Sequence, residues 1–198
     1  IAFVIGTATG WYKIVPLIAL QILVVNLVTD GLPALALAVE PGEPGIMRRP
    51  PRDPKRTIFD KRMISYLLGI GFWTMLASLG VFLWAINSGR TPVEAQCLCF
   101  VTLVSVELFN CFNCRSEKLS LFRMNPFSNK WLLAAVASSW AIAVAIVYAP
   151  FLQGPFHTYP MSLQDWGIVL LAGVLVLIPV EISKLITARR TRPSPKVI

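Results

Sequence analysis

The stretch NLVTDGLPAL, Asn26 to Leu35, decides the fold of this chain. It lies inside an apolar run from Leu17 to Val39 that is long enough to cross a lipid bilayer. The run nevertheless contains an acid, Asp30, and a helix-breaking pair, Gly31 and Pro33. An ionisable side chain at membrane depth is energetically costly, and such residues usually mark functional sites. The run therefore predicts a membrane helix that carries part of a site.

Proline at position 33 has no N–H, and its ring crowds the carbonyl of Thr29, so we predict that the helix unwinds around Asp30–Pro33. Asn26, Thr29 and Asp30 are spaced i, i+3 and i+4 and share one helix face. Their oxygens are the ligands that a hard cation such as calcium prefers. The alternative is a proline-kinked helix in which the buried aspartate bonds to a neighbour.

Composition places the chain among membrane proteins, since 56% of its 198 residues are hydrophobic and 14% are charged. The formal charge of +8 comes mainly from three basic clusters, which lie at Arg48–Arg62, Arg115–Lys130 and Lys184–Lys196. Basic loops mark the cytoplasmic side of a membrane, which predicts a cytoplasmic C-terminus. The clusters flank apolar spans and lack interleaved aromatics, so they indicate contact with lipid headgroups and not with nucleic acid.

Apolar runs and turn residues predict an all-α, polytopic transmembrane helical bundle that forms a single domain over residues 1–198. We expect five full spans at about 17–39, 63–86, 93–114, 131–151 and 163–186, preceded by the end of another helix at Ile1–Ala8. The chain starts inside an apolar stretch without the features of a signal peptide. We therefore expect Ile1 to be a truncation point within a longer protein.

A second intramembrane acid, Glu107, lies near the middle of its predicted span and has no basic neighbour in sequence. We predict that it faces Asp30 as a further metal ligand. The alternative is a protonated glutamic acid that bonds to a backbone carbonyl. Together with Asn26 and Thr29, these residues offer about five oxygens, whereas calcium takes roughly 6–8. The predicted ligand set therefore needs helices that lie outside this chain.

The remaining reactive side chains predict structural roles. Cys97 and Cys111 are 14 residues apart on one predicted helix, or roughly 21 Å, which one tetrahedral metal site cannot span. We interpret Cys97, Cys99, Cys111 and Cys114 as free thiols that are buried as small apolar groups. His157 stands alone in an external loop and suggests no site.

Catalytic motifs of soluble enzymes are missing from the sequence, so no catalytic residue is assigned. The third acid in an apolar span, Glu181, has Lys184 three residues later. That spacing favours a salt bridge at the end of a helix over a ligand role.

Several motifs resemble the P-type cation-transporting ATPases, and the similarity is greatest to calcium pumps of the sarcoplasmic-reticulum type and their bacterial relatives. VNLVTDGLPALAL (25–37) and IMRRPPR (46–52) look like the sixth transmembrane helix and the loop that follows it. VELFNCFNCRSE (106–117), NPFSNKWLL (125–133) and PVEISKLI (179–186) resemble the eighth helix, the entry to the ninth and the tenth, in the right order. The resemblance implies the end of helix five followed by helices six to ten.

By this resemblance, Asn26, Thr29, Asp30 and Glu107 bind calcium as the transported ion. The chain would be the C-terminal membrane segment of an ATP-driven cation pump, a multi-pass protein of a bacterial plasma membrane. ATP and magnesium would act only through cytoplasmic domains absent from this chain, so the segment should not hydrolyse ATP alone. Its partners would be calcium ions, the lipid bilayer, and the missing N-terminal helices and cytoplasmic domains. The alternative is a free-standing helical membrane protein without ATPase activity, acting as a passive cation pathway or as a subunit.

Overall fold

The computed structural model describes residues 15–42, 61–116, 120–121 and 124–190. Within these residues the chain is helical and contains no strand. The helical segments that are long and apolar enough to cross a membrane are Ala19–Ala38, Met63–Asn87, Pro92–Asn113, Lys130–Tyr148 and Leu163–Lys184. The predicted all-helical membrane bundle is therefore confirmed. The predicted helix end at 1–8, the arginine–proline motif at 46–52 and the basic residues after position 190 lie outside the described residues.

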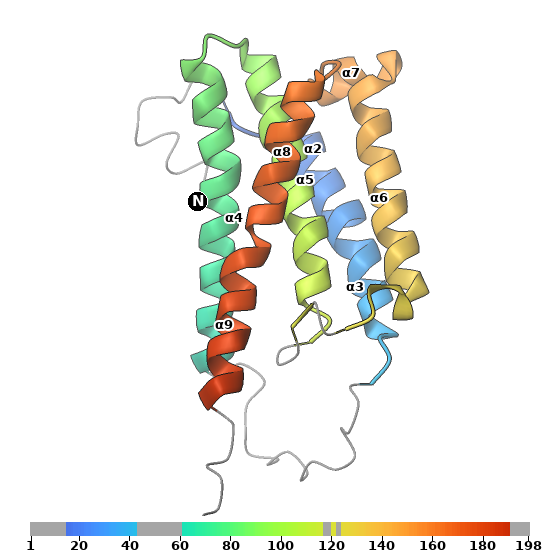
Figure 1. Cartoon of the computed structure of the whole chain (residues 1–198). Coiled ribbons are helices and arrows are strands. Elements are labelled where there is room, and N and C mark those ends of the chain that lie inside the picture. The colour runs from blue at the N-terminus through green and yellow to red at the C-terminus, as the bar shows by residue number, and fades with distance from the viewer. Residues whose placement is uncertain (1–14, 43–60, 117–119, 122–123, 191–198) are drawn as a thin grey trace, which may run out of the picture.

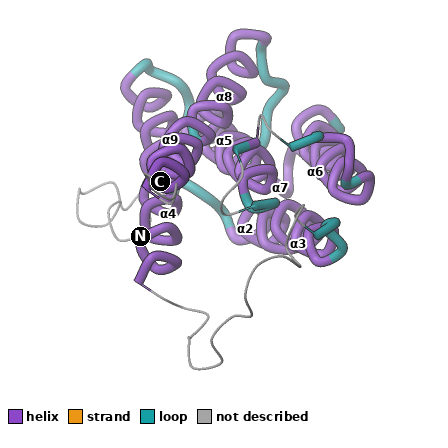
Figure 2. The backbone as a smooth tube through the Cα atoms, turned by 60° about the horizontal axis from the view of Figure 1, so that its bottom comes forward, coloured by secondary structure: helices purple, strands orange, loops and turns teal. Residues whose placement is uncertain are grey.

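One helix, α5 (Pro92–Asn113), lies at the centre of the bundle (Figure 2). Of the membrane-length stretch of α5, 72% is buried inside the bundle, whereas the buried share of the other four spans is between 17% and 33%. The helices that pack against it are α4 (Lys61–Asn87), α6 (Lys130–Tyr148), α8 (Leu163–Leu175) and α9 (Leu177–Arg190), together with the first span. The helix that carries Glu107 is thus enclosed by protein on most of its surface.

Side-chain caps fix where three of these helices begin. Thr91 accepts a hydrogen bond from the Glu94 N–H in a reciprocal capping box, and Pro92 occupies the first turn of α5. Ser162 forms the same kind of box with Asp165 at the start of α8. Asn129 caps the start of α6, and its side-chain oxygen accepts a hydrogen bond from the Leu132 N–H.

The spans alternate in direction, as Figure 1 shows. At one end of the bundle lie the end of α3 (Gly31–Ala38), the start of α4, the end of α5, the start of α6 and the end of α9. The turn between α4 and α5 and the short helix α7 (Pro150–Phe156) lie at the opposite end. The alternating spans therefore place the helix ends next to all three basic clusters at the same end of the bundle.

One predicted helix limit differs from the structure and one predicted span contains an interruption, and a proline lies near each. The span predicted over 131–151 ends at Tyr148, because Ala149 precedes Pro150 and adopts an extended conformation (ψ 118°). The span predicted over 163–186 is interrupted at Val176, between α8 and α9. Pro179 cannot donate a hydrogen bond to the carbonyl four residues back, which weakens the helix at this point.

Helices α8 and α5 pack closely together at Gly173. A Cβ atom at this position would lie 2.9 Å from the Cβ of Ser105 and 2.7 Å from the Cδ2 of Phe109. Glycine therefore allows the two helix backbones to pack closely, as small residues do between membrane helices. Ser105 and Phe109 lie on either side of Glu107 in sequence, so this contact supports the part of α5 that carries the acid.

At the end of the bundle opposite the basic clusters, an ion pair joins the turn before α5 to α8. The guanidinium of Arg90 lies 2.7 Å from Asp165 Oδ1, and the Tyr159 hydroxyl donates to Asp165 Oδ2 at 2.8 Å. Burial, followed by its bond to the Asp165 carboxylate, raises the pKa of Tyr159 above its usual value.

Candidate cation site

The first span consists of three segments: α2 (Ala19–Val24), the π-helical segment η1 (Val25–Asp30) and α3 (Gly31–Ala38). The prediction that the helix unwinds around Asp30–Pro33 was therefore wrong in form and position. The backbone stays helical through the proline, and the irregular turn lies directly before it. A π-helical turn absorbs an extra residue without opening the helix, and such turns are frequent at functional sites.

Two carbonyls of the irregular turn accept hydrogen bonds from side chains. The Thr29 hydroxyl donates to the Val25 carbonyl within the same segment at 2.7 Å. The Ser139 hydroxyl, from α6, donates to the Val28 carbonyl at 3.0 Å. Irregular backbone at membrane depth is tolerated where other parts of the protein supply such partners.

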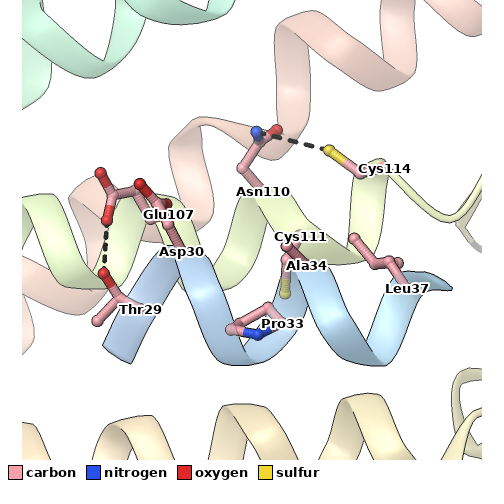
Figure 3. Close-up of a pocket in the computed structure, with 9 residues that line it drawn as sticks. All are labelled: Thr29, Asp30, Pro33, Ala34, Leu37, Glu107, Asn110, Cys111 and Cys114. Atoms are coloured by element: carbon pink, nitrogen blue, oxygen red, sulfur yellow. Dashed lines mark hydrogen bonds between the residues drawn. The ribbon is translucent and has the colours of Figure 1, made fainter. Parts of the chain in front are cut away.

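The Thr29 hydroxyl also joins the first span to the central helix. It lies 2.8 Å from Glu107 Oε2, as the dashed line in Figure 3 shows. A hydroxyl carries one proton, so its contacts to Val25 and Glu107 can both be hydrogen bonds only when Glu107 brings a second proton. Thr29 and Glu107 therefore form a polar pair that links the two helices.

A cavity of about 170 Å³ lies beside this pair. It has room for several water molecules. Its walls come from α3, η1 and α5, and Figure 3 shows the two acids toward one end of it and Cys114 toward the other. The lining residues are Thr29, Asp30, Pro33, Ala34, Leu37, Glu107, Asn110, Cys111 and Cys114. Side-chain oxygens from two helices thus line one hollow.

The structure brings together three of the four residues predicted as ligands: Thr29, Asp30 and Glu107. The fourth, Asn26, is exposed and does not line the cavity. Asn110 lines the cavity although it was not predicted to do so. Its spacing of i+3 from Glu107 puts both on one face of α5, and this signal could have found it.

The described residues contain no group of three or more His, Cys, Asp and Glu side chains that could hold a metal ion. Asp30 and Glu107 are the two acids among the described residues that line the cavity. Cys97, Cys99 and Cys111 are free and buried, as predicted. Cys114 is free but exposed, so the prediction of a buried thiol was wrong there. It is the C-cap residue that follows the last residue of α5.

A buried ionic cluster holds the end of α3 near the cavity. The Arg115 side chain is fully buried and donates from Nε and Nη2 to Glu40 Oε1, at 2.8 and 2.7 Å. Asn129 Nδ2 donates to Glu40 Oε2 at 2.6 Å and to the Ala36 carbonyl at 2.9 Å. These bonds tie α3 to the end of α5 and the start of α6. Glu40, Arg115 and Asn129 are far apart in sequence, and they were not singled out.

The predicted salt bridge between Glu181 and Lys184 is confirmed, with 3.5 Å between the charged atoms. Glu181 also accepts hydrogen bonds from the Ser120 hydroxyl and the Leu121 N–H. Lys184 donates to the carbonyl of Asn113, the last residue of α5, at 2.9 Å. The pair therefore anchors α9 to the connection that follows α5 and takes no part in the cavity.

Known proteins with similar sequences are ATPases. A calcium-transporting ATPase of Bacillus subtilis is 40% identical over 158 residues, which cover 78% of this chain and 17% of that protein. Calcium-transporting ATPase 1 of Bacillus cereus is 33% identical over 191 residues, 89% of this chain and 21% of that protein. Calcium-transporting ATPase 2, endoplasmic reticulum-type, of Arabidopsis thaliana is 30% identical over 240 residues. The match covers 91% of this chain and 23% of that protein.

The chain thus spans between 17% and 23% of the length of these relatives. A family model described as the C-terminus of cation-transporting ATPases matches residues 14–186, which include the whole first span, the cavity and α8. With its five membrane-length helices and a cavity that holds two carboxylates, the chain belongs to this family of cation-transporting ATPase C-terminal regions.

Proposed function

We propose that this chain is the C-terminal membrane segment of an ATP-driven calcium pump and supplies part of its intramembrane cation site. Thr29, Asp30 and Glu107 would be ligands, with Asn26 contributing once further helices cover its exposed face. The observation that carries the proposal is the Thr29–Glu107 contact beside the cavity that Asp30 lines. Carboxylate and hydroxyl oxygens are the ligands that calcium prefers, and two carboxylates balance one divalent charge.

The exposure of Asp30 and Asn26 supports a larger assembly. A carboxylate in a membrane span normally faces other protein or a wet cavity, not lipid. Transmembrane helices supplied by the rest of the pump would cover this side and complete the ligand set. ATP and magnesium would act through cytoplasmic domains beyond these 198 residues. Phosphorylation of those domains would move Asp30 between states of high and low calcium affinity.

The proposed location is a bacterial plasma membrane, with the C-terminus in the cytoplasm. The basic clusters border the end of the bundle at which α3, α5 and α9 finish. Positively charged connections are retained on the cytoplasmic side. The external side would then hold the turn after α4 and the helix α7, where Arg90 is held by Asp165.

The test uses the full-length ATPase that contains this segment. We expect Asp30→Asn to abolish calcium-dependent phosphorylation from ATP, because the site loses a charged ligand. We expect Glu107→Gln to raise the calcium concentration needed for half-maximal phosphorylation. The matched control is Glu94→Gln, at the far end of the same helix in its N-terminal cap, which should leave the calcium dependence unchanged. Normal calcium-stimulated turnover in Asp30→Asn would overturn the proposal.

A passive cation pathway or a subunit without ATPase activity is the other function considered, and the family match does not favour it. Purified chain reconstituted into liposomes distinguishes the two. Calcium flux without ATP, lost in Asp30→Asn, would support the passive pathway.

A further inference from the structure

Helix α6 makes a hydrogen bond to η1 beside the candidate cation site through Ser139. Its hydroxyl donates to the Val28 carbonyl of η1 at 3.0 Å, across 111 residues of sequence. Ser139 has no exposed surface. It does not line the cavity, so it cannot itself be a ligand for a cation held there. Its effect on such a cation has to pass through the backbone of η1.

Ser139 bonds to a turn that lies next to Pro33, a residue without an N–H. In an α-helix the N–H at position 33 would bond to Thr29, and in the π-helical register it would bond to Val28, five residues back. Proline supplies neither bond. A carbonyl without a partner at membrane depth is costly, and a serine on a neighbouring helix is a common remedy. Ser139 therefore adds, from α6, a hydrogen bond to a turn beside which Pro33 removes a backbone donor.

Two consecutive residues of η1 are thus held by two different helices. Val28 is bound through its carbonyl by Ser139 of α6, and Thr29 is bound through its hydroxyl to Glu107 of α5. Asp30 is the next residue and lines the cavity. Hydrogen bonds to Val28 from one helix and to Thr29 from another fix the orientation of the π-helical turn about the helix axis. They thereby fix the direction in which Asp30 projects.

We propose that Ser139 is a positioning residue for the cation site, acting through the Val28 carbonyl to hold the π-helical turn in the form that presents Thr29 and Asp30. This inference rests on the proposed function, since it assigns α6 a role in that same site. Residues that orient metal ligands typically change metal affinity by about 10–100-fold when they are replaced. We expect an effect of that kind on calcium affinity, with little change in the maximal rate once calcium saturates.

The neighbouring serine offers a matched control. Ser138 is exposed, and its hydroxyl donates to the Ala135 carbonyl within α6 itself. In the full-length ATPase, Ser139→Ala should raise the calcium concentration for half-maximal phosphorylation about 10-fold or more, and Ser138→Ala should leave it unchanged. Ser139→Thr keeps the hydroxyl and should restore most of the affinity. If Ser139→Ala and Ser138→Ala show the same calcium dependence, the inference is wrong.

Amide hydrogen exchange separates this inference from the proposed function and does not require calcium activity. In Ser139→Ala, peptides over residues 25–32 should exchange faster than in the wild type, while peptides from α5 and α8 stay protected. Faster exchange throughout the bundle would mean a general loss of stability and would overturn the positioning role. If the wild-type ATPase shows no calcium dependence but the local exchange effect appears, the proposed function fails and the role of Ser139 in holding the turn stands.

Discussion

Replacing Gly173 by alanine should force apart the two helices that meet beside Glu107. The added methyl carbon would lie 2.9 Å from Ser105 Cβ and 2.7 Å from Phe109 Cδ2. Carbon atoms in contact normally lie about 3.5–4.0 Å apart. The ring of Phe109 can rotate, but Ser105 Cβ is bonded directly to the backbone of α5. Relief therefore requires α8 to move away from the central helix.

The expected loss of stability follows from two opposing terms. Overpacking of this kind costs about 1–3 kcal/mol. Alanine also favours a helix over glycine by roughly 1 kcal/mol. Gly167→Ala isolates the second term, because Gly167 lies in the same helix and no atom lies within 4 Å of a Cβ placed there. The free energies of unfolding of the two variants should therefore differ by about 1–3 kcal/mol, or roughly 2–12 °C in Tm.

The chain's own cysteines report the melting. Cys97, Cys99 and Cys111 are buried, so a thiol-reactive fluorophore labels them only when the bundle opens, whereas exposed Cys114 reacts beforehand. We expect Gly173→Ala in detergent to show this labelling at a lower temperature than the wild type, and Gly167→Ala at the same or a higher temperature. If Gly173→Ala melts no lower than Gly167→Ala, the close packing of α8 on α5 is not as described.

Two further predictions concern the polar clusters at the ends of the bundle. Arg115→Met and Glu40→Gln should each cost about 3–5 kcal/mol, because each leaves a buried charge without its partner. The double variant should cost clearly less than the sum, and additive losses in denaturant unfolding would argue against the pair. Because the pKa of Tyr159 is raised, the unfolded chain loses this proton first as the pH rises above about 10, and stability falls there. Tyr159→Phe should make the melting temperature depend less steeply on pH in that range, and an unchanged slope would contradict this.

Local patterns were enough to predict the five spans and the cavity's main polar residues. Apolar runs of membrane length separated by Gly, Pro and basic residues specify helices almost without tertiary information. Asp30 and Glu107 were predictable as neighbours because an acid in a lipid-spanning helix tends to face the protein interior. Whether they and Thr29 bind a cation remains a prediction.

Features that depend on distant partners could not be predicted in this way. The π-helical turn before Pro33 receives a hydrogen bond from α6, 111 residues away in sequence, which local patterns could not predict. The Glu40–Arg115 pair joins residues that are 75 positions apart in the sequence, with α4 and α5 between them. Asn26 shares a helix face with Asp30 in an ideal α-helix, but the π-helical turn between them changes that spacing. The prediction from periodicity used α-helical spacing throughout, whereas this span contains both α-helical and π-helical turns.

The central position of α5 has a consequence for how the bundle is made. A ribosome completes α5 at Asn113 and reaches the start of α8, at Leu163, 50 residues later. At about 5–20 residues per second this interval lasts roughly 3–10 s. During that time Ser105, which meets α8 at Gly173 in the finished bundle, has no α8 beside it. Biogenesis of this membrane segment therefore includes a period in which its central helix depends on the insertion machinery or on earlier helices for shelter from lipid.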